Sequence, residues 1–99
     1  MISLSELCQE AHEYAISAGF WEEPINLGEK VALIHSEASE LLEELRKGDK
    51  NQWAIREELA DICIRVFDMV GYFDFDLEAA ISEKMAVNRE RPHKHGKMF

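Results

Sequence analysis

The sequence has few cysteines and few basic residues, and both shortages exclude classes of protein. Cys8 and Cys63 lie far apart and form no CxxC pair, so we expect two small buried hydrophobic residues rather than a disulfide or a metal site. The 11 lysines and arginines stand against 20 acidic residues, which gives a net charge of −9. Because binding to a phosphate backbone needs a basic surface, nucleic acid is not expected as the main partner.

Long hydrophobic runs are also missing. No apolar stretch approaches the roughly 20 residues that a membrane-spanning helix needs. The first residues, from Met1 to Glu6, show no basic segment followed by an apolar run, so no secretory signal is expected. We therefore expect a cytoplasmic protein without a membrane partner. The 99 residues, 46% of them hydrophobic, fit one globular domain over 1–99.

Alternating strand patterns are absent as well, and apolar residues recur at helical spacing instead. The predicted fold class is therefore all-α. Four helices are expected, over about 3–18, 26–47, 52–73 and 76–88. Asp76 is suited to cap the last helix, and Lys47-Gly48-Asp49 is expected to end the second. Residues 91–99 form a basic tail that Pro92 keeps out of the last helix.

Two matched pairs of carboxylates are the strongest chemical signal. Glu37 and Glu40 stand at positions i and i+3 of the second predicted helix, and Glu58 and Asp61 have the same spacing in the third. At about 100° per residue, each pair flanks the apolar stripe of its helix on the same side. If the two helices pack antiparallel, four carboxylates can converge. Such a cluster needs cations, and hard oxygen ligands suit Mg²⁺ or Mn²⁺. The alternative is a solvated acidic face.

The two acidic pairs, with what surrounds them, resemble a known family. The pattern of Glu37-x-x-Glu40, seventeen residues and Glu58-x-x-Asp61 is similar to that of the MazG-like nucleotide pyrophosphohydrolases, in the all-α NTP pyrophosphatase superfamily. The ending K-x-x-x-N-x-x-R-x-x-x-H-G-K, over 84–97, is similar too. The resemblance extends from about Leu27 to Lys97. It implies an oligomeric, four-helix-bundle-like MazG fold.

The resemblance also implies an activity, in which (d)NTP is hydrolysed to (d)NMP and pyrophosphate to clean the nucleotide pool. The family's magnesium ligands match the four carboxylates, and Mn²⁺ is a possible substitute. An activated water would attack the α-phosphorus. One glutamate, with Glu37 as the candidate, would act as the base while the others, Glu40, Glu58 and Asp61, hold metal.

Polar side chains near the end of the chain are expected to hold the phosphates. Lys84 and Asn88 lie one turn apart on the predicted inner face of the last helix, together with Ile81. Both match phosphate-contacting positions of the family, and Arg91 does too, so these residues would bind substrate and Lys84 would also be catalytic. The alternative for Lys84 is a side chain that only snorkels past the edge of the core.

Several other residues are candidates for a role in the site. Trp21 is the first candidate to line the base pocket, followed by Phe20 and Trp53, although aromatic residues in a connector also form packed corners. Arg65 either pairs with a carboxylate or lies at the surface. The histidines of His93-Lys94-His95 belong to a solvated tail or close over the phosphates.

Other functions fit part of the sequence. Within the superfamily, a phosphoribosyl-ATP pyrophosphohydrolase-like enzyme is the nearest alternative. A non-catalytic helical interaction module would use its acidic pairs only for solvation and would bind Mg²⁺ no better than any acidic surface. A di-iron bundle uses Glu-x-x-His motifs, and neither acidic pair ends in histidine. The identity of the base is left open.

Self-association is expected from the placement of apolar residues. Ile64 and Phe67 lie outside the main stripe of the third helix, with Ile64 about 160° from its centre, so one bundle can hardly bury both faces. A homodimer or a dimer of dimers would cover the remainder. The resemblance implies the same, because members of the family build their sites with neighbouring subunits. The tail or the aromatic connector of one subunit would then complete the site of another.

Overall fold

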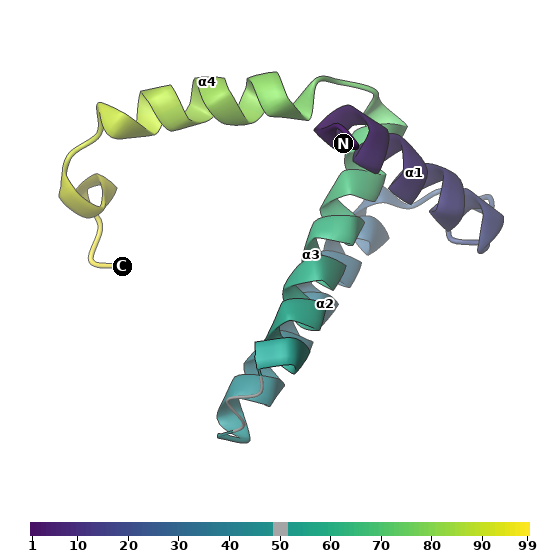
Figure 1. The fold of residues 1–99 in the computed structure, drawn as a ribbon, viewed down its shortest axis with the longest axis horizontal. Helices are drawn as coiled ribbons and strands as arrows, with labels where there is room; N and C mark the ends of the chain where they lie inside the picture. The colour runs from purple at the N-terminus through teal and green to yellow at the C-terminus, as the bar shows by residue number, and fades with distance from the viewer. Residues whose placement is uncertain (49–51) are drawn as a thin grey trace.

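The described residues, 1–48 and 52–99, form helices and no strand in this computed structural model (Figure 1). The elements are α1 (Leu4–Ser17), α2 (Leu27–Arg46), α3 (Gln52–Phe73), α4 (Leu77–Arg89) and a short 3₁₀ turn, η1 (His93–Gly96). The all-α prediction is confirmed, and each helix begins and ends within one residue of its predicted bounds. Asp49, in the predicted end of the second helix, lies outside the described residues.

Local hydrogen bonds explain where the helices begin. The side chains of Ser3, Asn26 and Asp76 each accept a hydrogen bond from the backbone N–H three residues later, which satisfies an otherwise unpaired donor of the first turn. Gly19, with φ of 91°, follows α1 in the left-handed region that glycine adopts without strain.

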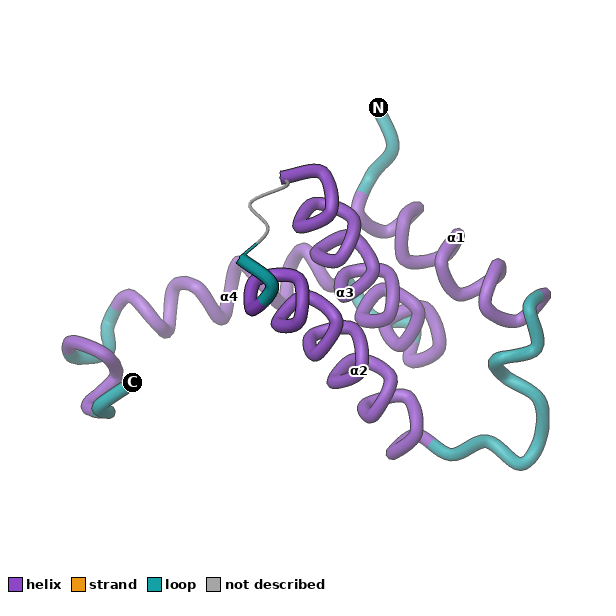
Figure 2. Tube along the Cα trace, turned by 90° about the horizontal axis from the view of Figure 1, so that it is seen from below, coloured by secondary structure: helices purple, strands orange, loops and turns teal. Residues whose placement is uncertain are grey.

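The central helix is α3, which α2 and α1 both contact (Figures 1 and 2). The helices α2 and α3 lie side by side and antiparallel, whereas α1 crosses α3 near the carboxyl end of α3. The crossing is close because position 71 is glycine. A Cβ on Gly71 would lie 2.4 Å from the Cβ of His12 and 2.8 Å from the carbonyl oxygen of Cys8. A larger residue would push α1 away.

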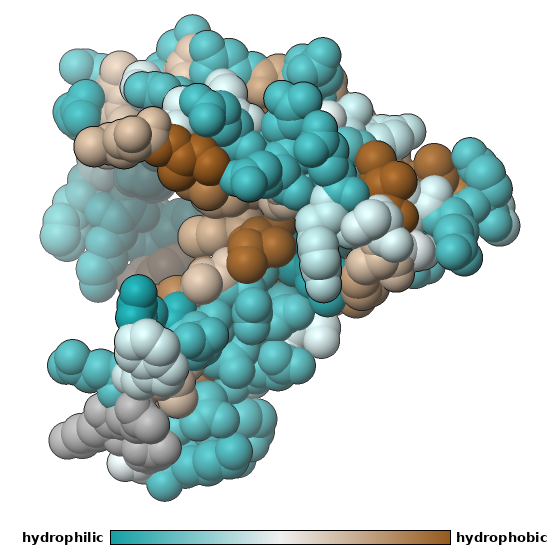
Figure 3. Space-filling view, turned by 45° about the vertical axis from the view of Figure 1, so that its right-hand side comes forward, coloured by the Kyte–Doolittle hydropathy of each residue, from teal (hydrophilic) through white to brown (hydrophobic). Residues whose placement is uncertain are grey.

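The core of the single chain is small. In the part of the chain that the structure describes, the buried apolar residues are Cys8, Ala15 and Val70. Many large apolar side chains are exposed, and Figure 3 shows apolar residues on the surface of the face that it draws. Cys8 is buried as predicted, but the prediction for Cys63 is wrong: it is exposed, because it borders an open apolar groove between α1 and α3. No described helix is both long and apolar enough to cross a membrane.

The last helix, α4, extends away from the antiparallel pair of α2 and α3. Figure 1 shows α4 running away from α2 and α3, and its packing is against α1. The predicted inner face is therefore only partly covered. Ile81 and Lys84 are exposed, which corrects the prediction that they face inward within one bundle. Asn88 is half-buried, and its buried Oδ1 has no hydrogen-bond partner in the described part of the chain.

Candidate active site

Antiparallel packing of α2 and α3 brings carboxylates together. Oxygen atoms of Glu37 and Glu40, from α2, and of Glu58, from α3, all lie within 4.8 Å of one another. We call these three residues the carboxylate cluster. Asp61, one turn beyond Glu58, is not part of it and instead lines a cavity beside Glu37. Of the four carboxylates expected to converge, three therefore meet and the fourth lies next to them.

The environment of the cluster disfavours three negative charges. Burial raises the pKa of Glu37 above its usual range, a hydrogen bond from Arg65 lowers it, and the neighbouring Glu40 raises it again. The Oε2 atom of Glu58 is buried and has no hydrogen-bond partner among residues 1–48 and 52–99. An unpaired carboxylate oxygen is costly to bury, and more so beside two further carboxylates. The donor set, all carboxylate oxygens, fits a hard divalent cation.

A cavity of about 240 Å³ lies beside the cluster. It is formed by α1, α3, Glu37 of α2 and the connector between α1 and α2, and Phe20, Glu37, Asp61, Arg65 and Asp68 are among its lining residues. The cavity therefore joins an aromatic ring to the carboxylates. Such a combination suits a ligand with a flat apolar part and an anionic part that binds through a cation.

Arg65 contacts both a carboxylate and an aromatic ring in the wall of this cavity. Its Nε donates a hydrogen bond to Oε1 of Glu37 over 3.3 Å, and its guanidinium lies 4.8 Å from the centre of the Phe20 ring. Of the two roles that the sequence left open for Arg65, the structure shows the pairing with a carboxylate.

Trp21 is not among the residues that line this cavity, but it is hydrogen-bonded to Asp68, which is one of them. Its Nε1 donates to Oδ1 of Asp68 over 2.8 Å, and the same oxygen is 2.8 Å from Nδ1 of His12. The indole stacks on Tyr72, with the ring centres 4.5 Å apart, and the ammonium of Lys30 lies 4.3 Å from the Trp21 ring centre. Lys30 also donates to the carbonyl of Phe20. The connector is thus a packed corner that also supplies a wall of the cavity.

Sequence reasoning missed His12, Lys30 and Asp68. Lys30 and Asp68 are both only 5% exposed, although charged residues are seldom buried. A signal was available for Asp68: residues 61, 65, 68 and 72 follow one another at helical spacing, so the polar face of α3 continues beyond the ExxD pair. Lys30 likewise stands three residues after Leu27 and four before Ile34, on the inward side of α2.

The structure does not bring the remaining predicted residues to the carboxylates of the same chain. Lys84, Asn88 and Arg91 lie on or after α4, which runs away from α2 and α3 (Figure 1). The histidines of His93-Lys94-His95 lie in η1 and are exposed. Trp53 is exposed in the first turn of α3, with the Arg56 guanidinium 4.4 Å from its ring centre.

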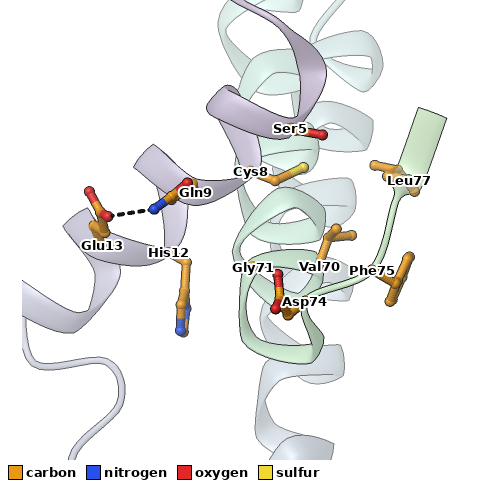
Figure 4. A pocket seen from close by; sticks show the side chains of 10 residues that line it. All are labelled: Ser5, Cys8, Gln9, His12, Glu13, Val70, Gly71, Asp74, Phe75 and Leu77. Carbon is orange, nitrogen blue, oxygen red and sulfur yellow. Dashed lines mark hydrogen bonds between the residues drawn. The ribbon is translucent and has the colours of Figure 1, made fainter.

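A second cavity, of about 300 Å³, lies on the other side of the α1–α3 crossing (Figure 4). Figure 4 shows Cys8 and Val70 within it and the hydrogen bond between Gln9 and Glu13 at its edge. Burial raises the pKa of the Cys8 thiol, so its reactive thiolate form is disfavoured.

Comparison with known proteins identifies a family that this chain matches. The model of a family described as MazG nucleotide pyrophosphohydrolase domain matches residues 28–95. No curated protein and no solved structure gives a significant match. The matched range contains the carboxylate cluster, Asp61, Arg65 and the segment from Lys84 to His95, whereas the aromatic connector precedes it.

Proposed function

Because this chain belongs to the MazG nucleotide pyrophosphohydrolase family, we propose that it cleaves nucleoside triphosphates between the α- and β-phosphates. The products are a nucleoside monophosphate and pyrophosphate, and the role is house-cleaning of (d)NTPs in the cytoplasmic nucleotide pool. The observation that carries the proposal is the carboxylate cluster, in which a buried oxygen of Glu58 has no hydrogen-bond partner among the described residues. A cation would satisfy that oxygen and relieve the repulsion among the three carboxylates.

The cluster is the proposed site of Mg²⁺, with Mn²⁺ as a substitute. Glu37, Glu40 and Glu58 would hold it, and Asp61, on the next turn of α3, would complete the set of ligands. A divalent cation there supplies charge neutralisation for the phosphates and activation of the attacking water. Glu37 is also the proposed base: one oxygen of its carboxylate would hold the cation, and the other would accept the proton of the attacking water.

The connector is proposed to hold the nucleobase. The Phe20 ring lines the cavity beside the carboxylates. Trp21 is the proposed substrate-binding tryptophan at the same end, and its hydrogen bond to Asp68 fixes its ring plane. A flat base would lie against the Phe20 ring, with Trp21 supporting that end of the connector, while its phosphates reach the carboxylate cluster.

Lys84, Asn88 and Arg91 are proposed to bind the phosphates in a homodimer or a dimer of dimers. The direction of α4 supports a second copy as the recipient of these residues, because α4 leaves the carboxylates of its own chain. Asn88 Oδ1 is buried and finds no hydrogen-bond partner within residues 1–48 and 52–99, and Ile64 is exposed in the apolar groove between α1 and α3. A second copy would cover this groove and receive α4.

A panel of nucleotides assayed with Mg²⁺ tests the proposal. We expect release of pyrophosphate and a monophosphate, with ³¹P NMR used to identify the products, and no release by Glu40→Gln. A diphosphate and free phosphate as primary products would contradict attack at the α-phosphorus. A non-catalytic interaction module would release nothing and would bind Mg²⁺ no better than the exposed acidic surface of α2.

A further inference from the structure

Arg65 is a cation placed directly beside the proposed metal ligands. Its Nε lies 3.3 Å from Oε1 of Glu37, and the side chains of Arg65 and Glu37 are 24% and 13% exposed. Glu37 in turn lies within 4.8 Å of the carboxylates of Glu40 and Glu58. The positive charge of Arg65 therefore offsets part of the repulsion in the cluster when no metal is bound.

We propose that Arg65 is a counter-ion with two alternative partners. It pairs with Glu37 while the cluster is without metal, and it binds a phosphate of the nucleotide once a divalent cation takes Glu37. The inference rests on the proposed function and assigns to this residue a role in substrate binding at the same site.

The contact with Glu37 is suited to exchange. It is a single hydrogen bond through Nε rather than the bidentate pair that arginine and carboxylate form when they bind strongly. Each side chain keeps some exposure, 24% for Arg65 and 13% for Glu37, so solvent can reach both groups when the contact breaks. A metal ion that needs Glu37 as a ligand can therefore displace Arg65 at low cost, although the arginine charge opposes its entry.

The surroundings of Arg65 also suit a phosphate. The bond to Glu37 does not use the two terminal nitrogens, and guanidinium matches phosphate geometry with paired donors. The Phe20 ring, 4.8 Å away, gives the guanidinium a second contact that does not depend on Glu37. Released from Glu37, Arg65 thus stays at the wall of the cavity, beside the place where the phosphates would meet the metal.

Mn²⁺ binding without nucleotide tests the first partner. Free Mn²⁺ is measured by electron paramagnetic resonance in titrations of the wild type, Arg65→Gln and Arg56→Gln. The control removes the same charge from an exposed position of α3, next to Trp53. We expect Arg65→Gln to bind Mn²⁺ about two- to fivefold more tightly, which is the range of a partly exposed ion pair, and Arg56→Gln to match the wild type.

Binding of inorganic pyrophosphate with saturating Mg²⁺ tests the second partner. By calorimetry, Arg65→Gln should bind this probe about tenfold more weakly, as expected when one charge-assisted contact is lost. Arg65→Lys should keep the Mn²⁺ affinity of the wild type but bind pyrophosphate more weakly, because it retains the charge and loses the planar fork. Arg56→Gln should change neither affinity.

The outcomes separate this inference from the proposed function. If no variant binds Mn²⁺ above the level of an acidic surface, both are overturned. If the wild type binds Mn²⁺ and Arg65→Gln matches Arg56→Gln, only the inference is overturned. Unchanged affinity for pyrophosphate in Arg65→Gln also overturns it. If Arg65→Gln loses helix content by circular dichroism, the pyrophosphate affinity of Arg65→Lys is the deciding measurement. An affinity of Arg65→Lys equal to that of the wild type would refute phosphate as the second partner of Arg65.

Discussion

Replacing Glu58 with glutamine removes one charge from the carboxylate cluster while the side chain keeps its size. At 4.8 Å, the upper limit for the separations in the cluster, two unit charges repel by about 0.9 kcal/mol in bulk water and by about 3.5 kcal/mol at an effective dielectric of 20. Glu58 has two such neighbours, and Arg65 offsets part of the effect through Glu37. We therefore expect Glu58→Gln to raise the free energy of unfolding without metal by about 1–2 kcal/mol.

Magnesium should reverse the order of stability. A ligand that binds only the folded state at about 100 times its dissociation constant adds about 2.7 kcal/mol to the free energy of unfolding. The wild type should gain this increment, whereas Glu58→Gln, which lacks a metal ligand, should gain little. The variant is then the more stable protein in EDTA and the less stable one in Mg²⁺.

Thermal unfolding followed by far-UV circular dichroism measures this reversal. For a domain of this size, 1 kcal/mol corresponds to a shift in Tm of roughly 4–8 °C. The protein concentration is held constant, because self-association would otherwise shift the Tm. Glu57→Gln, which removes an exposed charge from the neighbouring position of α3, is the control. The reasoning is refuted if Glu58→Gln is less stable than the wild type in EDTA, or if Mg²⁺ stabilises both equally.

Three further predictions address turnover, assembly and pH. Asp61→Asn should abolish turnover while the helix content by circular dichroism stays unchanged, and wild-type activity would remove Asp61 from the site. Mixing inactive Lys84→Ala with inactive Glu58→Gln should restore about a quarter of wild-type activity if sites form between two copies that assort at random, whereas sites built within one chain would give none. Burial raises the pKa of Glu37, so the folded state holds this proton at higher pH than the unfolded state does. Without metal, stability should therefore rise as pH falls through the raised pKa of Glu37 towards its ordinary value, and Glu37→Gln, followed by urea unfolding, should lack this dependence.

Helix positions were predictable from the sequence because they depend on neighbours along the chain. Apolar spacing sets the period, Asn26 and Asp76 cap the first turns of α2 and α4, and Gly19 follows the end of α1. The phase of Glu37 and Glu58 against the apolar stripes follows from the same periodicity, and it predicted that α2 and α3 present carboxylates to each other.

Contacts between helices needed the tertiary structure, because periodicity fixes rotation about a helix axis but not the shift of one helix along another. That shift places Glu58 within reach of Glu37 and leaves Asp61 at the cavity. The close crossing at Gly71 brings α1 onto α3, where His12 and Trp21 share one oxygen of Asp68. The apolar pattern of α4 does not determine the direction in which this helix runs. In the tertiary structure α4 packs against α1 and runs away from α2 and α3, so its phosphate-binding candidates lie far from the carboxylates of their own chain.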